Sequence, residues 1–183
     1  MTALIIVIAI VAIVLIVSVS IYNSLIRSRN KAEEAEAAID AHLTQRYDLI
    51  PNLVETVKGY AKHESSTLEK VIEARNQAVA AKGVAEKDKA DNVVTQSLRS
   101  LFALSESYPE LKANQNFIAL QESLNNVERD LLDSRKYYNA TARDFNDRIQ
   151  TFPSNIIASA FHFKKLDYVK ADDAARTAPK ISF

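Results

Sequence analysis

The sequence predicts an all-α protein, in which a single N-terminal transmembrane helix continues into an elongated antiparallel bundle of long helices. Residues 1–26 contain no charged side chain, which separates them from a remainder rich in Glu, Lys and Asn. Only 2 of the 183 residues are glycine, about 1% against the ~7% usual in proteins, and this disfavours sheets with many turns. We therefore expect three parts: an anchor at residues 1–26, a helical bundle at residues 27–163 and a polar C-terminal tail at residues 164–183.

The run from Ala3 to Ile21 consists of Ile, Val, Leu and Ala, interrupted only by Ser18 and Ser20. As a helix it would span roughly 28 Å, close to the ~30 Å hydrocarbon layer of a bilayer. A cleaved signal peptide is the alternative, but it needs a basic segment before a shorter apolar stretch and a cleavage site of small residues. The sequence has none of these features. We expect an uncleaved anchor, whose residues in the lipid bilayer include Ala3, Leu4, Ile10, Leu15 and Ile21.

The first charged side chains after this run are basic: Arg27, Arg29 and Lys31. Basic residues next to a transmembrane helix favour the cytoplasmic side. This predicts a single-pass protein with its N-terminus outside and its helical domain in the cytoplasm. The absence of cysteine fits either compartment, because it forbids disulfides without requiring a reducing environment.

Beyond the anchor, apolar residues recur at steps of three and four from Ile39 to Val79, which is typical of an amphipathic helix. The pattern continues through Pro51, and this favours one kinked helix over two. A break at Pro51 stays open, because proline removes a backbone hydrogen bond and disfavours helical backbone in the residue before it. We expect this first helix to end near Gly83.

A second helix is expected from about Asp88 to Ser107, where Pro109 interrupts it, and a third from about Asn114 to Thr151. Asn114 is a suitable N-cap for the third helix. This helix carries a heptad seam that predicts burial. Its residues are Phe117, Leu120, Leu124, Val127, Leu131, Tyr138 and Phe145. Amphipathic helices of this length can bury one another only side by side, in an antiparallel bundle. A short apolar turn at residues 154–160 precedes the tail.

No pattern indicates catalysis. His63-Glu64 resembles the start of a zinc-protease helix, but position 67 is Thr where the second His would stand. Two glycines cannot build a phosphate-binding loop, and carboxylates on amphipathic helices are usually solvated or ion-paired. We expect no enzyme activity, no cofactor, no metal site and no small-molecule substrate. The 23 basic and 23 acidic residues cancel, so we also expect no nucleic-acid binding.

Some polar residues interrupt the apolar faces. Arg46-Tyr47-Asp48 precedes Pro51, and Asn139 and Asn146 flank the aromatic part of the seam. Helical bundles use such residues to fix the register of their helices. We expect that role here, rather than a ligand site.

Several segments are similar to one known family. They are Tyr22–Asn30, Gln45–Glu64 with its Arg-Tyr-Asp-Leu-Ile-Pro-Asn-Leu core, Glu106–Asn114 and Phe152–Ala158. Together they resemble the LemA family over nearly the whole chain. The resemblance implies a bacterial single-pass membrane protein with a helical cytoplasmic domain and no settled molecular function. Some members are linked to magnetosome membranes, and others are encoded beside membrane proteases.

Two functions fit these features. The first is a membrane-anchored scaffold that self-assembles as a homo-oligomer at the cytoplasmic face of the bacterial inner membrane. The second is a membrane-tethered adaptor that presents its bundle or its tail to a partner, such as a membrane protease. In the adaptor, the tail residues Pro179, Ile181 and Phe183 would add to a partner as a strand or fill a pocket, and a disordered terminus is the alternative for the same residues.

Overall fold

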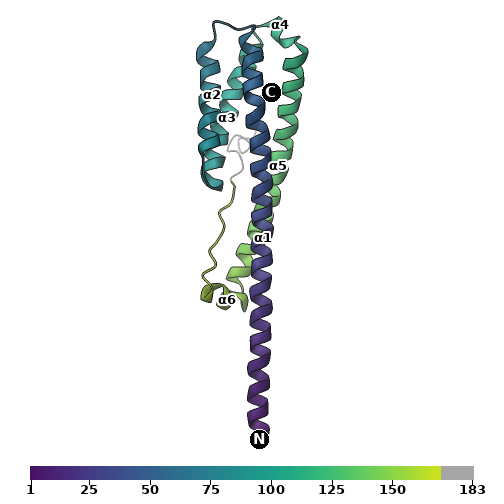
Figure 1. Ribbon diagram of the computed structural model, residues 1–183, viewed down its shortest axis with the longest axis vertical. Coiled ribbons are helices and arrows are strands. Elements are labelled where there is room, and N and C mark those ends of the chain that lie inside the picture. Colours follow the sequence, from purple (N-terminus) through teal and green to yellow (C-terminus); the bar gives the residue numbers. More distant parts are fainter. Residues whose placement is uncertain (170–183) are drawn as a thin grey trace, which may run out of the picture.

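A computed structural model describes residues 1–169 of the chain, and within them every regular element is a helix (Figure 1). This confirms the predicted all-α class and the antiparallel bundle. The helices are α1 (Thr2–Lys58), α2 (Ser65–Ala80), α3 (Val84–Ser105), α4 (Pro109–Lys112), α5 (Gln115–Gln150) and α6 (Ser154–Ala160).

Helix α1 is continuous over 57 residues and runs through Pro51 without ending. Its N-terminal half is long and apolar enough to cross a membrane. The predicted anchor residues Ala3, Leu4, Ile10 and Leu15 are exposed there, and Ile21 is half-buried where the bundle begins. The remainder of α1, from Leu25 onward, has one buried face that forms part of the bundle core.

The first predicted helix ends near Gly83 as expected, but it is in fact two helices, and the break between them lies at residues 59–64 rather than at Pro51. Gly59 follows the last residue of α1, and glycine has the lowest helix propensity after proline. The apolar pattern did not reveal this break, because α2 turns back and buries its own stripe in the same core. Val57, Leu68 and Val71 are all buried in one cluster.

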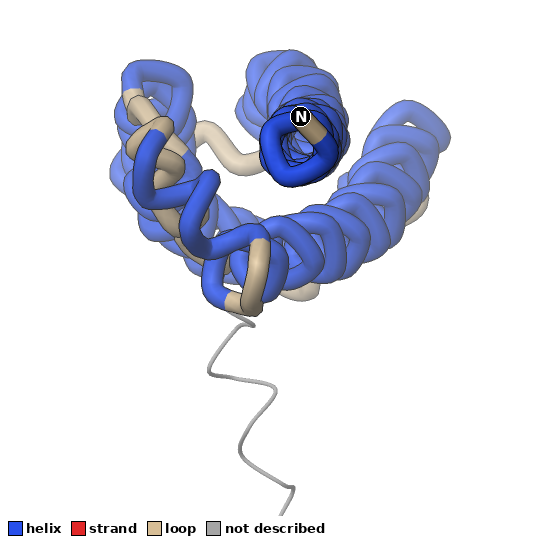
Figure 2. The backbone as a smooth tube through the Cα atoms, turned by 90° about the horizontal axis from the view of Figure 1, so that it is seen from below, coloured by secondary structure: helices blue, strands red, loops and turns tan. Residues whose placement is uncertain are grey.

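Helices α1 and α5 form the long central pair, and the α2–α3 hairpin packs on the half of this pair farther from the N-terminus (Figure 1). Seen along the long axis, the other helices form an arc around α1 (Figure 2). Helix α3 begins at Val84, four residues before the expected start, after Gly83 adopts a positive φ of 75°. This conformation favours glycine, and it ends the turn between α2 and α3.

Helix α5 begins and ends close to the predicted residues. The side chain of Asn114 accepts a hydrogen bond from the backbone N–H of Phe117 at 3.0 Å, the expected N-cap. Of the seven seam residues, Leu120 is half-buried and the rest are buried. Phe117, Leu124, Leu131 and Tyr138 share one core cluster with residues of α1, α2 and α3, so the seam lies in a bundle of four long helices.

The segment after α5 is more ordered than the sequence predicted. Residues 154–160, expected as a turn, form α6, which packs against α1 and α5. Residues 161–169 then run back along the bundle; we call them the C-terminal strap. Val169 is buried and Leu166 packs against the core, so the bundle extends beyond the expected boundary at residue 163. The tail residues Pro179, Ile181 and Phe183 lie outside the described residues.

Candidate functional site

Charged side chains meet inside the bundle where α1, α3 and α5 come together. Arg46 and Asp91 are 4% and 1% exposed. Nη1 of Arg46 donates to both carboxylate oxygens of Asp91 at 2.8 Å, and Nη2 of Arg135 donates to the same carboxylate at 2.9 Å. The hydroxyl of Tyr47 also donates to Asp91, at 3.2 Å. We call these four residues the ion cluster.

Two further carboxylates contact the arginines of the cluster. Glu128 lies 2.9 Å from Nη2 of Arg46, and Asp88 lies 3.4 Å from Nη2 of Arg135. Within the described residues, every buried side-chain nitrogen or oxygen has a hydrogen-bond partner. The cluster therefore joins three helices through interactions that are satisfied.

The chemistry of the cluster does not suit proton transfer. The carboxylate of Asp91 lies between two guanidinium groups and accepts hydrogen bonds from both. Burial, with the charge and hydrogen bond of Asp91, raises the pKa of Tyr47 well above its usual value. Tyr47 is thus a neutral hydrogen-bond donor near neutral pH. These features support the role in helix register that the sequence predicted for Arg46-Tyr47-Asp48. Asp48 lies outside the ion cluster, where its exposed side chain is 3.8 Å from Arg75.

Asn139 and Asn146 hold the backbone of the C-terminal strap. Asn146 donates to the carbonyl of Leu166 at 2.9 Å and accepts from the N–H of Leu166 at 2.9 Å. Asn139 makes the same pair of bonds with Val169, at 2.8 and 2.9 Å. Each amide therefore pairs with one residue of the strap, much as a neighbouring β-strand would.

The spacing along the chain explains why both asparagines can pair with the strap at the same time. Seven helical residues advance roughly 10.5 Å, and three residues of extended chain advance roughly 10 Å. Asn139 and Asn146 are seven apart on α5, while Leu166 and Val169 are three apart on the strap.

Tyr138 also holds the strap, because its hydroxyl donates a hydrogen bond to the carbonyl of Asp167 at 2.9 Å. Burial, with the charges of Glu36 and Asp167, raises the pKa of Tyr138 to about 12.

Sequence reasoning found Arg46, Asn139 and Asn146 but missed their partners. Asp91 lies three residues before Val94 on the buried stripe of α3, and a charged residue at that position was the available signal for the ion cluster. No local signal marked Leu166 and Val169, because apolar and polar residues are mixed in residues 161–169 without a helical period.

An open groove lies between α1 and α2 at the end of the bundle farthest from the anchor. Its volume is about 930 Å³. Apolar side chains, including Val54, Leu68 and Ile72, form its floor, and Lys58 and Lys62 lie at its edge. Such a groove offers a surface on which a partner helix or peptide can pack.

The LemA family model matches residues 35–183. The chain belongs to the LemA family. The matched region includes the ion cluster, both asparagines and the strap, and it begins after the apolar half of α1.

One similar protein is Protein LemA of Metamycoplasma hominis. It is 24% identical over 159 residues, which cover 84% of this chain and 71% of the relative. The similarity therefore extends over most of this LemA-family chain.

Proposed function

We propose that this LemA-family protein is a membrane-anchored helical scaffold that self-assembles at the cytoplasmic face of the bacterial inner membrane and performs no catalysis. The observation that carries the proposal is the continuity of α1. The same 57-residue helix supplies the apolar segment and one side of the bundle core. The bundle is thus joined to the anchor by a helix, without a flexible linker.

This construction favours assembly. Every anchored copy has the same direction relative to the bilayer, so identical surfaces stand at the same height, and cyclic symmetry about the membrane normal is the natural arrangement. Confinement to a membrane raises the effective concentration of the copies. Ser18 and Ser20 permit close approach between anchor helices.

The test of self-assembly is the mass of the full-length protein by light scattering in mild detergent, compared with a fragment of residues 28–183. We expect a discrete oligomer of several copies for the full-length protein and a smaller species for the fragment. Circular dichroism of both samples controls for loss of helix. Monomers in both samples would contradict the scaffold.

The proposed orientation has its own test, because the chain contains no native cysteine. A cysteine at Thr2 should react with a membrane-impermeant maleimide on intact cells, whereas one at Lys62, an exposed residue of the loop between α1 and α2, should not. Both should react once the cells are permeabilised. The reverse pattern on intact cells would place the bundle outside.

The adaptor is the second candidate, and the groove between α1 and α2 supports it. The groove lies at the end of the bundle that extends farthest from the anchor, where a partner such as a membrane protease would have access. A monomeric full-length protein would favour this function over the scaffold.

A further inference from the structure

Three large apolar side chains are exposed near the end of α5 and around α6. Phe152 is 79% exposed, and Ile156 and Phe161 are each 59% exposed. Single exposed apolar residues are common, but these three lie within one short segment that packs on α1. We call them the apolar lip.

The lip lies at the level where α1 leaves its apolar run. The rings of Phe161 and Tyr22 are 4.6 Å apart between centroids, and Tyr22 directly follows Ile21, the last residue of that run. Ile157 of α6 packs with Ile21 in the small core cluster formed around Leu25. Figure 1 shows α6 beside α1, directly above the stretch of α1 that has no neighbouring helix.

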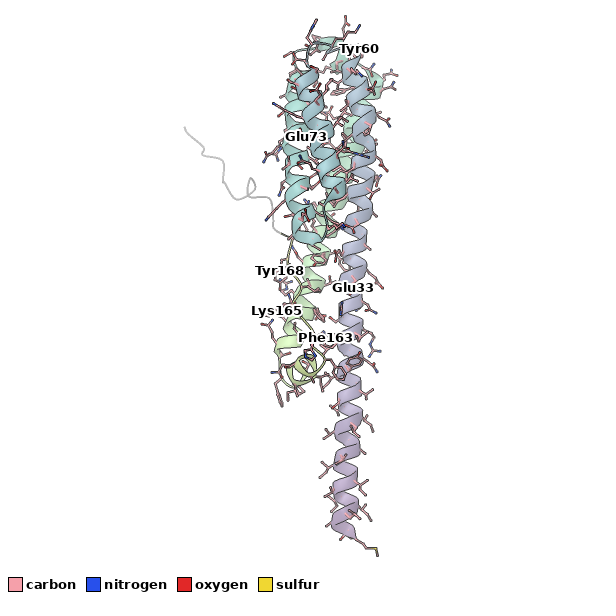
Figure 3. The ribbon with its side chains drawn as sticks, turned by 60° about the vertical axis from the view of Figure 1, so that its left-hand side comes forward. Glu33, Tyr60, Glu73, Phe163, Lys165 and Tyr168 are labelled. Carbon is pink, nitrogen blue, oxygen red and sulfur yellow. The ribbon has the colours of Figure 1, made fainter. Side chains whose placement is uncertain are left out.

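Basic residues gather just above the lip. Arg27, Lys31 and Arg148 line a pocket between α1 and α5, and Lys164 and Lys165 are exposed at the start of the strap. Figure 3 shows Lys165 slightly farther from the N-terminus of α1 than Phe163, which lies close to α1. We call these five residues the basic rim.

One acidic residue faces this pocket. Asp144 accepts hydrogen bonds from Arg148 at 3.0 Å and from Ser28 at 3.1 Å. It offsets the charge of Arg148, and Arg27 and Lys31 remain as additional positive charges on the pocket wall. Arg27 stands about 9 Å above Ile21 along the helix axis, a height that corresponds to the phospholipid headgroups when the apolar run fills the hydrocarbon layer.

We propose that the apolar lip and the basic rim form a second membrane-contact site, in which the lip enters the boundary between headgroups and acyl chains and the rim binds the phosphates of anionic lipids. Aromatic and aliphatic side chains below a basic layer are the pattern of surfaces that lie in the membrane interface. The proposal rests on the anchoring part of the proposed function, but not on self-assembly. Membrane contact through both the anchor and the lip fixes the rotation of the bundle about the axis of α1. Contact through the anchor helix alone leaves this rotation free.

The chain has no tryptophan, so one introduced Trp reports its own surroundings. We would place Ile156→Trp in the full-length protein, in vesicles of phosphatidylcholine and phosphatidylglycerol that contain acyl-brominated lipids. We expect this Trp to lose most of its fluorescence with bromine near the headgroup and less with bromine deep in the acyl chain. Circular dichroism verifies that the variant folds.

Two matched variants bracket this result. Leu15→Trp, within the anchor, should be quenched most by deep bromine. Tyr137→Trp replaces a residue of α5 that is 58% exposed and lies roughly 20 Å up the helix from the end of α5; it should not be quenched. If Leu15→Trp is quenched and Ile156→Trp is not, the lip proposal is wrong while the anchor stands. If neither is quenched, anchoring and lip both fail.

The same measurement identifies other coverings of the lip and tests the rim. A blue-shifted but unquenched Trp at position 156 would show that protein, such as a second copy, covers the lip in place of lipid, and would overturn the proposal. Quenching should be stronger with phosphatidylglycerol than in phosphatidylcholine alone, and Arg27→Gln with Lys31→Gln should remove that difference. Inorganic phosphate added to phosphatidylcholine vesicles should not reproduce it. Equal quenching in both lipids would overturn the role of the rim.

Discussion

Replacing Asp91 with alanine is expected to lower the free energy of unfolding by about 3–5 kcal/mol, the cost of removing one partner from a buried ion pair. Asp91 is 1% exposed and is the only group that both Arg46 and Arg135 contact among the ion pairs of the described residues. Without it, two guanidinium groups face each other inside the bundle. Glu128 and Asp88 compensate only in part, because Glu128 is 46% exposed and reaches only Arg46, and Asp88 contacts Arg135 at the longer distance of 3.4 Å.

Urea unfolding of the full-length protein in mild detergent, followed by circular dichroism, measures this effect. Asp130→Ala is the matched control, since Asp130 is exposed on α5, and it should change stability by less than about 0.5 kcal/mol. A variant that replaces Asp91, Arg46 and Arg135 together with apolar residues should recover much of the loss, because it removes the buried carboxylate together with both of its guanidinium partners. A loss below about 1 kcal/mol for Asp91→Ala would mean that water reaches the cluster.

The parts of the fold that depend on local sequence were predictable. The apolar run of α1 and the heptad seam of α5 are patterns that extend over many residues. The cap at Asn114 depends only on its own side chain and a backbone N–H three residues later. Periodicity gives the face of a helix but not its direction. The turn at Gly59 was therefore missed, because α1 and α2 bury their stripes in the same core.

The features that join distant segments were not predictable in the same way. Arg46 and Asp91 are 45 positions apart, and Asn146 and Leu166 are 20 apart. The sequence showed Arg46 and Asn146 as polar residues on otherwise apolar helix faces. It did not show their partners, because these lie far away along the chain. The lip was missed for a related reason: Phe152 and Phe161 look like buried residues until the position of α6 beside α1 is known.

The double variant Asn139→Ala with Asn146→Ala is expected to release the C-terminal strap. It removes four hydrogen bonds to the backbone of Leu166 and Val169. A buried polar group left unpaired costs about 1–3 kcal/mol. Without the two asparagines, the backbone groups of the strap therefore gain more by detaching and binding water than by staying buried and unpaired. We expect a loss of about 2–4 kcal/mol in the stability of the strap against local opening.

Amide hydrogen exchange measures this opening directly. In the unchanged protein the N–H groups of Leu166 and Val169 should exchange slowly, and in the double variant they should exchange at least about 30-fold faster, as a loss of 2 kcal/mol requires. The matched control is Asn125→Ala, an exposed asparagine on the same helix, which should leave both rates unchanged.

The position of the change within the chain separates release of the strap from general unfolding. If only the strap opens, amides of the seam around Leu131 keep their protection, because that part of α5 packs on α1 and α3 and makes no bond to the strap. Faster exchange throughout α5 would show that the asparagines hold the whole bundle. Unchanged exchange at Leu166 and Val169 would show that the apolar contacts of these two side chains suffice, and that the paired amides contribute alignment rather than stability.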